Sequence, residues 1–247
     1  SGLYRFDGNS FKKYEETGIT EVTTLFVDAQ GRLWIGTKDK GIALFTSDMV
    51  AYMSTSESLL DNPVLGIAQG SDGTIYAQLQ NGLCRVTSGG GLELKNPEIA
   101  GLDSLCLVNN YYLGVKDVKV VAFNQETQLS EVSPREKDVE FTCLAVLEDT
   151  ILAGCSNGEI VLIGFEDEKL SREEKFSNGH KEAIKKIDIL SSGVTTFVSE
   201  NYFGLMSTSG SFTTRKIEGF SGLTDISEDY QGNLWVSSDK DGICELA

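Results

Sequence analysis

The sequence predicts an all-β fold, a β-propeller of six four-stranded repeats with little or no helix. Three observations carry this prediction. One pattern of strands and turns recurs along the 247-residue chain. Its copies follow one another at intervals of roughly 40 residues, and short apolar runs lie between turn residues. A repeat of that length with several strands is typical of propeller blades.

The clearest copies of the repeat are residues 19–45 and residues 223–246. Each contains an apolar strand, a turn with an acidic residue first and Gly fourth, a Leu-Trp-Ile/Val strand, a polar turn and a third strand. Weaker copies span residues 63–86, 102–123, 141–163 and 183–206. Alignment of the large residue in the second strand gives one position in each copy: Trp34, Tyr76, Tyr112, Leu152, Phe197 and Trp235.

Turn residues lie where tight hairpins need them. Asp28 and Asp229 each begin a four-residue turn that ends in Gly, and we interpret them as turn-capping residues. Neither turn has the alternating oxygen ligands of a calcium-binding loop. After the second strand, where a tight hairpin needs a positive φ, most copies have a glycine: Gly41, Gly82, Gly158, Gly204 and Gly242. The third copy has Val118 there, so we expect its turn to differ.

The first residues of the chain align with the later half of a repeat. Residues 2–14 match residues 41–53, so residues 1–18 are interpreted as a half blade. The following units span about 19–61, 62–98, 99–138, 139–179, 180–219 and 220–247, all within one domain over residues 1–247. The expected propeller has six blades, or seven with one incomplete. Ser171–Ile187 is the clearest helical candidate, and its polar composition favours a loop.

Charge and cysteine content narrow the function classes. The chain has 21 Lys and Arg against 37 Asp and Glu, a net charge of −16, which argues against nucleic acid or an anionic membrane as partner. No apolar run approaches the ~18 residues of a membrane span. The five cysteines include no CxxC pair. Cys106, Cys143 and Cys155 lie in apolar stretches and are expected to be small buried side chains.

The sequence offers no catalytic set. His180 is the one histidine, and it lies in a polar linker where we expect a surface residue. A Ser-His-Asp or Cys-His catalytic set would have to use this one histidine, so none can be assembled convincingly. Trp34 and Trp235 are flanked by Leu and Ile or Val, so we expect them to pack between blades rather than to stack against a sugar. We therefore predict no catalytic residue, no metal site and no cofactor.

Residues 28–45, DAQGRLWIGTKDKGIALF, resemble the two-component regulator propeller repeat. The matching positions are Asp28, Gly31, Leu33, Trp34, Ile35, Gly36, Thr37, Gly41 and Phe45. In the last unit they are Asp229, Gly232, Leu234, Trp235 and Gly242. The resemblance is specific in these two units, moderate in residues 63–86 and weak in the middle three, and it covers about half the chain.

The resemblance implies a sensor function. In that family the propeller is the extracytoplasmic part of a bacterial membrane protein, periplasmic or at the cell surface, whose output is a histidine kinase or a diguanylate cyclase. Its ligand is often a carbohydrate. For this chain the expectation is a fragment of a longer sensor, anchored through other regions of the parent protein, homodimeric through them, and binding a small molecule.

The predicted ligand-binding residues lie in the loops that join the second and third strands. In a propeller these loops share one face with the connections between blades. Their amides and mixed charges could bind a polyhydroxy ligand, or they could simply be polar turn residues. The residues are Lys38, Asp39, Lys40, Gln80, Asn81, Asn157, Asn201, Tyr202, Asp239 and Asp241.

Two other functions remain open from the sequence. The chain could be a propeller enzyme similar to the streptogramin lyases or sugar lactonases, which use a divalent metal at the channel. Alternatively, it could be a scaffold that binds proteins through one face, as WD40 propellers do, which would require a large exposed apolar patch.

Overall fold

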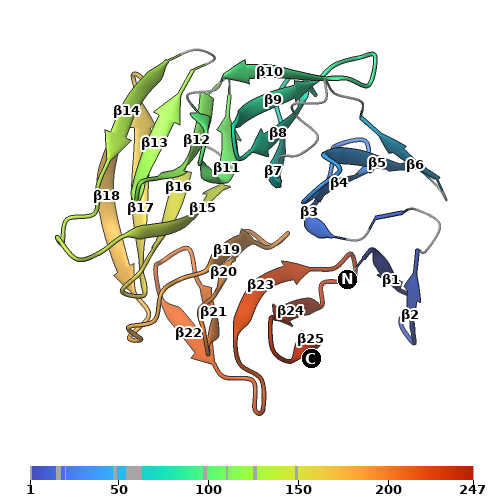
Figure 1. Ribbon diagram of the computed structural model, residues 1–247. Coiled ribbons are helices and arrows are strands. Elements are labelled where there is room, and N and C mark those ends of the chain that lie inside the picture. The colour runs from blue at the N-terminus through green and yellow to red at the C-terminus, as the bar shows by residue number, and fades with distance from the viewer. Residues whose placement is uncertain are drawn as a thin grey trace. The chain divides into compact units, whose positions relative to one another are not determined.

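A computed structural model describes residues 2–14, 18–19, 21–46, 49–53, 63–96, 99–109, 111–124, 127–147 and 150–246. In this part of the chain every regular element is a β-strand, as Figure 1 shows. Backbone contacts divide the chain into two compact units. The first unit is Ser1–Tyr111 with Asn124–Thr127, and the second is Tyr112–Phe123 with Gln128–Ala247.

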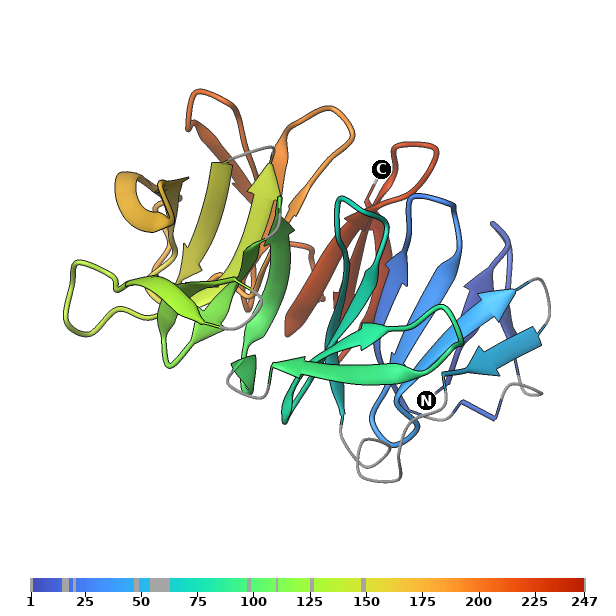
Figure 2. The ribbon, with the colours of Figure 1, turned by 90° about the horizontal axis from the view of Figure 1, so that it is seen from above.

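The first unit contains a two-stranded sheet and two four-stranded antiparallel sheets. The two-stranded sheet pairs β1 (Tyr4–Phe6) with β2 (Phe11–Lys13). The first four-stranded sheet has the order β3 (Val22–Val27), β4 (Leu33–Thr37), β5 (Ile42–Thr46) and β6 (Met49–Tyr52). The second contains β7 (Val64–Gln69), β8 (Ile75–Leu79), β9 (Gly82–Val86) and β10 (Leu92–Asn96). Figure 2 shows these two sheets next to each other, in blue and in teal.

The remaining sheets repeat the same order. The third is formed by β11 (Asp103–Val108), β12 (Tyr111–Lys116), β13 (Lys119–Phe123) and β14 (Gln128–Val132). The fourth is formed by β15 (Phe141–Leu147), β16 (Thr150–Cys155), β17 (Glu159–Glu166) and β18 (Lys169–Ser177). The fifth is formed by β19 (Lys186–Ile189), β20 (Thr195–Val198), β21 (Phe203–Met206) and β22 (Phe212–Arg215). The sixth contains β23 (Leu223–Glu228), β24 (Leu234–Ser238) and β25 (Gly242–Leu246). These are the blades of a six-bladed β-propeller, so the predicted fold class is confirmed.

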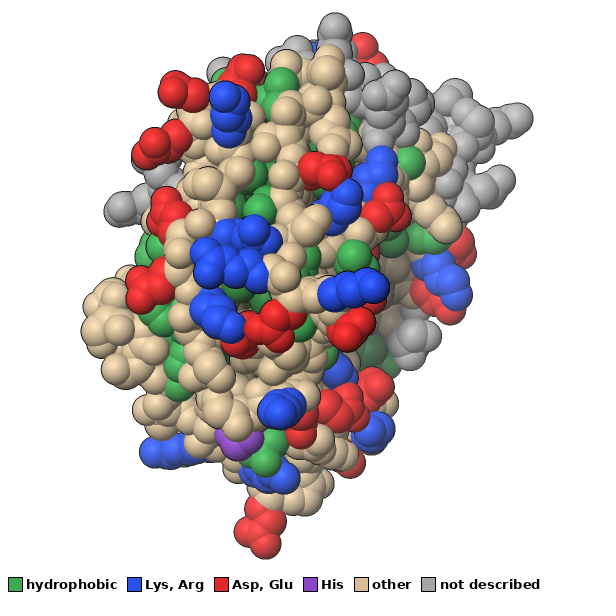
Figure 3. Space-filling model, turned by 90° about the vertical axis from the view of Figure 1, so that its left-hand side faces the viewer, with side chains coloured by type: hydrophobic (Ala, Val, Ile, Leu, Met, Phe, Trp, Pro, Cys, Tyr) green, Lys and Arg blue, Asp and Glu red, His purple; other side chains and the backbone are tan. Residues whose placement is uncertain are grey.

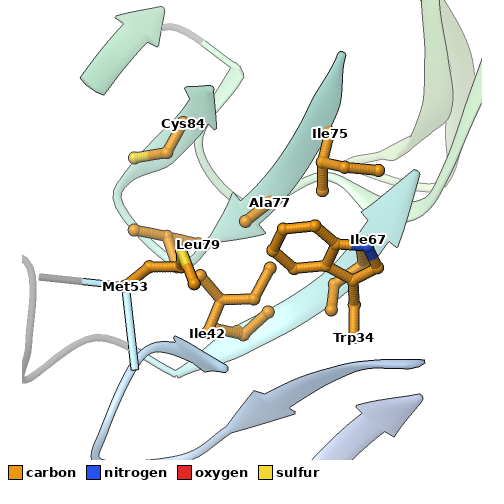
Figure 4. Packing of buried hydrophobic residues seen from close by; sticks show 9 residues of the cluster. Trp34, Ile42, Met53, Ile67, Ile75, Ala77, Leu79 and Cys84 are labelled. Carbon is orange, nitrogen blue, oxygen red and sulfur yellow. The ribbon is translucent and has the colours of Figure 1, made fainter. Parts of the chain in front are cut away.

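The second strand of each four-stranded sheet is buried over most of its length, whereas in β24 of the three-stranded sixth sheet only Val236 is buried. Trp34 on β4 is 4% exposed and packs against Ile67 and Ile75 of the second sheet, as Figure 4 shows. Its neighbour Ile35 points to the opposite face and packs against Leu3, which precedes β1. The expectation that Trp34 packs between blades is therefore confirmed.

The segment Ser171–Ile187, for which a loop was favoured over a helix, contains no helix, and residues 178–185 do form a loop, whereas the residues before them form a strand. Residues 171–177 form most of β18, the outermost strand of the fourth sheet. The sequence gives little sign of this because an outermost strand faces solvent and needs few apolar residues. In β18 only Leu170 is buried and Phe176 half-buried. The backbone N–H of Leu170 donates to the Ser130 hydroxyl of β14, 3.0 Å away.

The fifth sheet is one residue out of step with the sequence alignment. Phe197 pairs with Gly204, just as Ile35 pairs with Ala43 in the first sheet. Phe197 therefore takes the place of Ile35 rather than that of Trp34. For the same reason Gly204 lies inside β21, and the prediction that it forms the hairpin turn is wrong. An alignment that matches the largest side chains cannot tell which face a strand residue points to.

The hairpin between β12 and β13 has two residues between the paired Lys116 and Lys119, and it differs from the other hairpins between second and third strands, as predicted, because both residues have a positive φ and neither is glycine. Asp117 and Val118 have φ angles of 48° and 63°. Two successive positive φ values define a type I′ turn, which favours Asn-Gly or Asp-Gly. The turn therefore needs the same left-handed backbone as Gly41, whose φ is 68°. Here a β-branched residue adopts it, at a cost in conformational energy.

We predict that Val118→Gly raises the free energy of unfolding by about 1 kcal/mol, because glycine adopts the positive φ without strain. Urea denaturation followed by circular dichroism measures this. The reverse change is the matched control. Gly41→Val should destabilise by a similar amount through the backbone alone, since nothing lies within 4 Å of a Cβ atom built at Gly41. An unchanged stability in both variants would contradict the argument.

Candidate functional site

In the first unit, Lys38, Asp39 and Lys40 lie in the turn between β4 and β5, where the sequence predicts them. The Lys38 ammonium is 3.4 Å from a Glu21 carboxylate oxygen. The Lys40 ammonium donates to the Gly18 carbonyl at 2.5 Å and lies 5.9 Å from the centre of the Tyr52 ring. Burial and the Asp39 carboxylate raise the pKa of Tyr52 above its ordinary value. These charges contact the segment before β3 and the end of β6.

Gln80 and Asn81 form the two-residue turn between β8 and β9, next to the pair Leu79–Gly82. Gln80 is exposed, whereas the Asn81 side-chain oxygen is buried and has no hydrogen-bond partner. The same is true of the side-chain oxygen of Gln78, whose amide nitrogen donates to the carbonyls of Leu79 and Ile99 at 2.7 and 3.2 Å. A buried acceptor without a donor costs roughly 1–3 kcal/mol. This hairpin therefore has acceptor capacity that the protein does not use.

In the second unit, Asn157 lies in the turn between β16 and β17. Its amide donates to Glu159 at 3.0 Å. The Lys175 ammonium lies 2.7 Å from Glu159 and 3.3 Å from Glu136. These groups border a cavity of about 40 Å³, with space for no more than a few waters. Residues that line the cavity include Pro134, Glu136, Val139, Cys155, Val161 and Lys175.

The turn that holds Asn157 touches the linker before the fifth sheet. Gly158 has a φ of 85°, and a Cβ atom there would lie 2.1 Å from the His180 carbonyl oxygen and 3.1 Å from that of Glu182. Only glycine permits both this backbone angle and this close approach. Gly158 therefore fixes the linker that contains His180 and Glu182 against the Asn157 turn.

The carboxylate of Glu182 organises the turn between β20 and β21. It accepts hydrogen bonds from the backbone N–H of Asn201 at 2.9 Å, from its side-chain amide at 3.0 Å and from the Ser199 hydroxyl at 3.1 Å. Burial alone would raise the pKa of Glu182, but the hydrogen bonds from Asn201 and Ser199 lower it below its ordinary value. Glu182 is therefore an anion that holds Asn201 in place.

The rings of His180 and Tyr202 stack with their centres 3.8 Å apart. The Lys216 ammonium lies 4.7 Å from the centre of the Tyr202 ring, within the range of a cation–π interaction. The His180 Nε2 atom is 3.0 Å from the Thr214 hydroxyl. His180 is thus half-buried in a structural contact, so the expectation of a plain surface residue is wrong.

Glu200 joins the turns of the fifth and sixth sheets. Its carboxylate pairs with Lys185 and, at 2.8 Å, with Lys240, and these two ammonium groups lower its pKa to about 2. Lys240 lies between Asp239 and Asp241 in the turn after β24. Asp239 donates its backbone N–H to the Gly222 carbonyl at 3.0 Å, and Asp241 accepts the N–H of Ser221 at 2.8 Å.

The structure thus brings part of the predicted set together in the second unit. We call this group the loop cluster: Asn157, His180, Glu182, Glu200, Asn201, Tyr202, Lys240 and the aspartates beside Lys240. Its turns are joined by Gly158, Glu182 and Glu200. In the first unit, Lys38–Lys40 and Gln80–Asn81 occupy separate hairpins. Sequence reasoning missed Glu182 and Lys216, because nothing in a polar linker shows which carboxylate will meet which turn.

The loop cluster is equipped for hydrogen bonding rather than for a recognised reaction. It presents amides, carboxylates and ammonium groups, and the one imidazole is stacked on Tyr202. In the described part of the chain, no three His, Cys, Asp or Glu side chains converge as a metal site would require. Acidic and basic side chains are likewise interspersed on the side of the molecule drawn in Figure 3.

Three of the five cysteines are buried thiols with a raised pKa. All five are described and none is in a disulfide. Cys84, Cys143 and Cys155 are buried, and burial raises the thiol pKa of the first two to about 11 and that of Cys155 to about 12. Cys106 is half-buried, less than expected. Among the residues that the structure describes, no helix is long and apolar enough to cross a membrane.

The turn that begins at Asp28 is a single hydrogen-bonded unit with Trp34. One Asp28 carboxylate oxygen accepts the backbone N–H groups of Gln30 and Arg32 at 3.0 and 2.9 Å. The other accepts the Trp34 indole N–H at 2.8 Å and the Arg32 side chain at 2.6 Å. Burial alone would raise the pKa of Asp28, but these bonds lower it to about 2. The capping interpretation is confirmed, and the bond to Trp34 was not foreseen.

The last sheet repeats this turn with the same partners. Asp229 accepts the backbone N–H groups of Gln231 and Asn233 at 2.8 and 2.9 Å, and the Trp235 indole N–H at 3.0 Å. The bond from Trp235 is the main reason why the pKa of Asp229 falls to about 2. The Asp-x-x-Gly-x-x-Trp spacing is therefore a structural signature, in which the acid holds the indole of the following strand. In the first sheet that indole packs against the neighbouring blade.

Residues 18–39, which contain this signature, match the model of the two-component regulator propeller family. The match covers the end of the first linker, β3 and β4, a small part of the chain. No curated protein matches the chain.

Solved structures similar to this chain are propellers with low sequence identity. The streptogramin B lyase structure has a TM-score of 0.71 at 16% identity, covering 92% of this chain and 83% of the lyase. Virginiamycin B lyase from Staphylococcus aureus has a TM-score of 0.69 at 18% identity, and the match covers 92% of this chain and 84% of the lyase. The extracellular domain of a putative hybrid two-component system from B. thetaiotaomicron has a TM-score of 0.68 at 12% identity, and the match covers 92% of this chain. The chain spans 33% of that last structure. These likenesses show the fold.

We predict that Asp28→Asn lowers the free energy of unfolding by roughly 2 kcal/mol at pH 7, because an amide has a single acceptor oxygen and cannot serve both the backbone N–H groups of the turn and the Trp34 indole N–H. The folded-state pKa of Asp28, about 2, lies below the ordinary value of 3.8. Its contribution is therefore complete above about pH 4 and is lost as the pH falls through about 2. Denaturation at several pH values should show the difference between the two proteins shrinking over that window.

Asp72→Asn is the matched control for this experiment. Asp72 is the third residue of the equivalent turn of the second sheet, which begins at Gly70. It bonds to Thr74, through the backbone N–H and the hydroxyl, both at 2.9 Å. It is exposed and holds no indole. Asp72→Asn should lower the free energy of unfolding clearly less than Asp28→Asn does. An equal loss of stability in the two variants would contradict the role assigned to Trp34.

Proposed function

We propose that this chain is a non-enzymatic, extracytoplasmic ligand-binding propeller of a bacterial membrane signalling protein. The observation that carries the proposal is the match of residues 18–39 to the two-component regulator propeller family. It is supported by a similar fold in the extracellular domain of a putative hybrid two-component system. In this proposal the parent protein supplies the membrane anchor, the dimer contact and a histidine kinase or diguanylate cyclase output.

The loop cluster is the proposed binding surface. Asn201 and Lys240 each have further N–H donors beyond those that Glu182 and Glu200 accept, and Asp239 and Asp241 offer carboxylate acceptors. Mixed donors and acceptors on neighbouring loops suit a ligand with several hydroxyl groups, such as a carbohydrate. The Tyr202 ring stacks on His180, so it contributes to the shape of the surface more than to stacking on a ligand. Lys38, Asp39, Lys40, Gln80 and Asn81 of the first unit are kept as proposed ligand contacts of separate hairpins.

A lyase is the second candidate, because two of the similar structures are a streptogramin B lyase and a virginiamycin B lyase, each matched over most of its length. The specific observation in its favour is the presence of Glu182, Glu200 and Asp239 on neighbouring loops of the second unit. The carboxylates of Glu182 and Glu200 are, however, engaged with Asn201 and with two lysines. Because these carboxylates are already bonded within the protein, they favour the sensor proposal over the lyase. A protein-binding scaffold is a third possibility, since the WD40 propeller of Doa1 is also similar in fold.

We predict that a glycan and metabolite library will contain compounds that raise the melting temperature of the chain. For such a compound, Asn201→Ala and Lys240→Ala should each weaken binding about tenfold, the value of one lost hydrogen bond. Isothermal titration calorimetry measures this. Arg85→Ala is the matched control, because Arg85 pairs with Glu93 on the outer strands of the second sheet. A library without binders, or binding that Arg85→Ala weakens equally, would contradict the proposal.

The enzyme candidate has its own test. The chain is incubated with virginiamycin B, and the compound is followed by chromatography with and without added divalent metal. We expect no consumption above the rate without protein. Turnover that Glu182→Gln and Glu200→Gln abolish, while the fold is retained, would replace the sensor proposal by the lyase.

A further inference from the structure

A cleft lies between the first and second sheets of the first unit. Its volume is about 290 Å³, near the lower end of the range for pockets that bind small molecules. Apolar side chains of both sheets line it: Trp34, Leu44, Met53, Ile75 and Val86. Figure 4 shows Trp34, Met53 and Ile75 in the adjoining core cluster. Polar side chains complete the lining, and of these Arg32 and Ser88 are exposed. The cleft therefore combines an apolar interior with a polar rim.

The fourth and fifth sheets of the second unit form the equivalent interface. Ile160 lies in the fourth sheet where Ile42 lies in the first, because each pairs with a glycine of the second strand. Phe176 pairs with Ile160. Met53 lies opposite Ile42 in the same way and donates its backbone N–H to the Ile42 carbonyl at 3.0 Å. Phe176 therefore takes in the second unit the place that Met53 takes in the first.

The turns that face these two residues are also equivalent. The turn between β9 and β10 and the turn between β21 and β22 are closed by the same pattern of backbone hydrogen bonds. A Cβ atom built at Gly210 in the second of these turns would lie 2.3 Å from the Phe176 ring. At Gly90 in the first, the nearest described atom would be Met53 Sδ, 3.7 Å away. An aromatic ring thus fills this place in the second unit, whereas the thioether of the first unit leaves the cleft open.

Arg32 gives the rim of the cleft a cationic donor group. Its Nε donates to Asp28 at 2.6 Å and its Nη2 to Gln30 at 3.3 Å. A guanidinium carries five N–H donors in a planar fork, so in the described part of the chain these two bonds leave further donors. The guanidinium carbon lies 5.5 Å from the centre of the Trp34 ring, whereas the Asp28 side chain is fully buried. An anionic group in the cleft would therefore meet the guanidinium rather than the carboxylate.

We propose that this cleft binds a small aryl carboxylate. The ring of the ligand takes in the first unit the place that the Phe176 ring takes in the second, against Met53 and Val86. The carboxylate accepts hydrogen bonds from Arg32, a pairing that suits the planar guanidinium. Burial of the ring removes apolar surface from water and drives the association. The cleft shares no residue with the loop cluster, so this site is separate from the ligand-binding surface proposed above.

Phenylacetate is the probe that tests the proposal, because it consists of one ring and one carboxylate. Isothermal titration calorimetry should show saturable binding with a dissociation constant in the millimolar range, as expected for so small a ligand. Phenylacetamide, which has the same shape without the charge, should bind about tenfold more weakly. Arg32→Met should remove this preference for the acid. Failure of phenylacetate to bind, or equal affinity of the original chain for the acid and the amide, would overturn the proposal.

The cleft can be filled with the side chains of the second unit. Val86 ends β9 and Met206 ends β21, directly before the two equivalent turns. Met53→Phe combined with Val86→Met therefore gives the first unit the side chains that pack in the second. This double variant should lose phenylacetate binding, while its melting temperature stays the same or rises because more apolar surface is buried. Unchanged affinity in the folded double variant would refute the assignment of the site.

A second variant blocks the cleft from an exposed position, so the test does not depend on the folding of the double variant. Ser88→Trp should weaken phenylacetate binding at least about tenfold. Thr208→Trp is the matched control, because Thr208 has the same place in the turn between β21 and β22, and its affinity should be unchanged. In nuclear magnetic resonance spectra, the amide signals of Thr87 and Gly90 should shift during the titration. Equal weakening by the two tryptophan variants, or shifts confined to the loop cluster, would overturn the proposal.

Discussion

The hydrogen bond between the Asp28 carboxylate and the Trp34 indole connects the local turn to the packing of the blades. A buried indole N–H requires an acceptor, and the turn before β4 places one at 2.8 Å. Gly31, with a φ of 75°, lets the chain close the turn, and Arg32 covers the acid from outside. The tryptophan is then held in one orientation, facing Ile67 and Ile75 of the next sheet. The backbone geometry of the turn therefore also determines how the first blade packs against the next.

The repeat was readable because its turns and apolar runs obey local rules. The strands around Trp34 and the capping by Asp28 follow from propensity and spacing within a dozen residues. Two errors came from positions where local signals are ambiguous. Phe197 could be aligned by size, but only the sheet register shows that it occupies the place of Ile35. The polar residues of β18 are compatible with a loop until the pairing with β17 is known.

The candidate site was predictable only in part, and for a physical reason. Turn type indicates that Asn157, Asn201 and Asp239 lie in hairpin loops. It does not indicate their partners, because those come from linkers and turns that are distant in the sequence. Glu182 reaches Asn201 across 19 positions of sequence, and Glu200 reaches Lys240 across 40. Such pairings depend on how the blades are stacked, and several side chains in the linkers are interchangeable in chemistry.

The tryptophan turn also gives the protein an optical property. The chain has two tryptophans, Trp34 in the first unit and Trp235 in the second. Each indole donates to an aspartate carboxylate, so each emission spectrum is sensitive to whether its own turn is closed. Tryptophan fluorescence from the whole molecule therefore reports on the turns of two blades, because the other four blades contain no tryptophan. Replacing one tryptophan would leave a separate reporter for each compact unit, so the cooperativity between them could be measured without an added label.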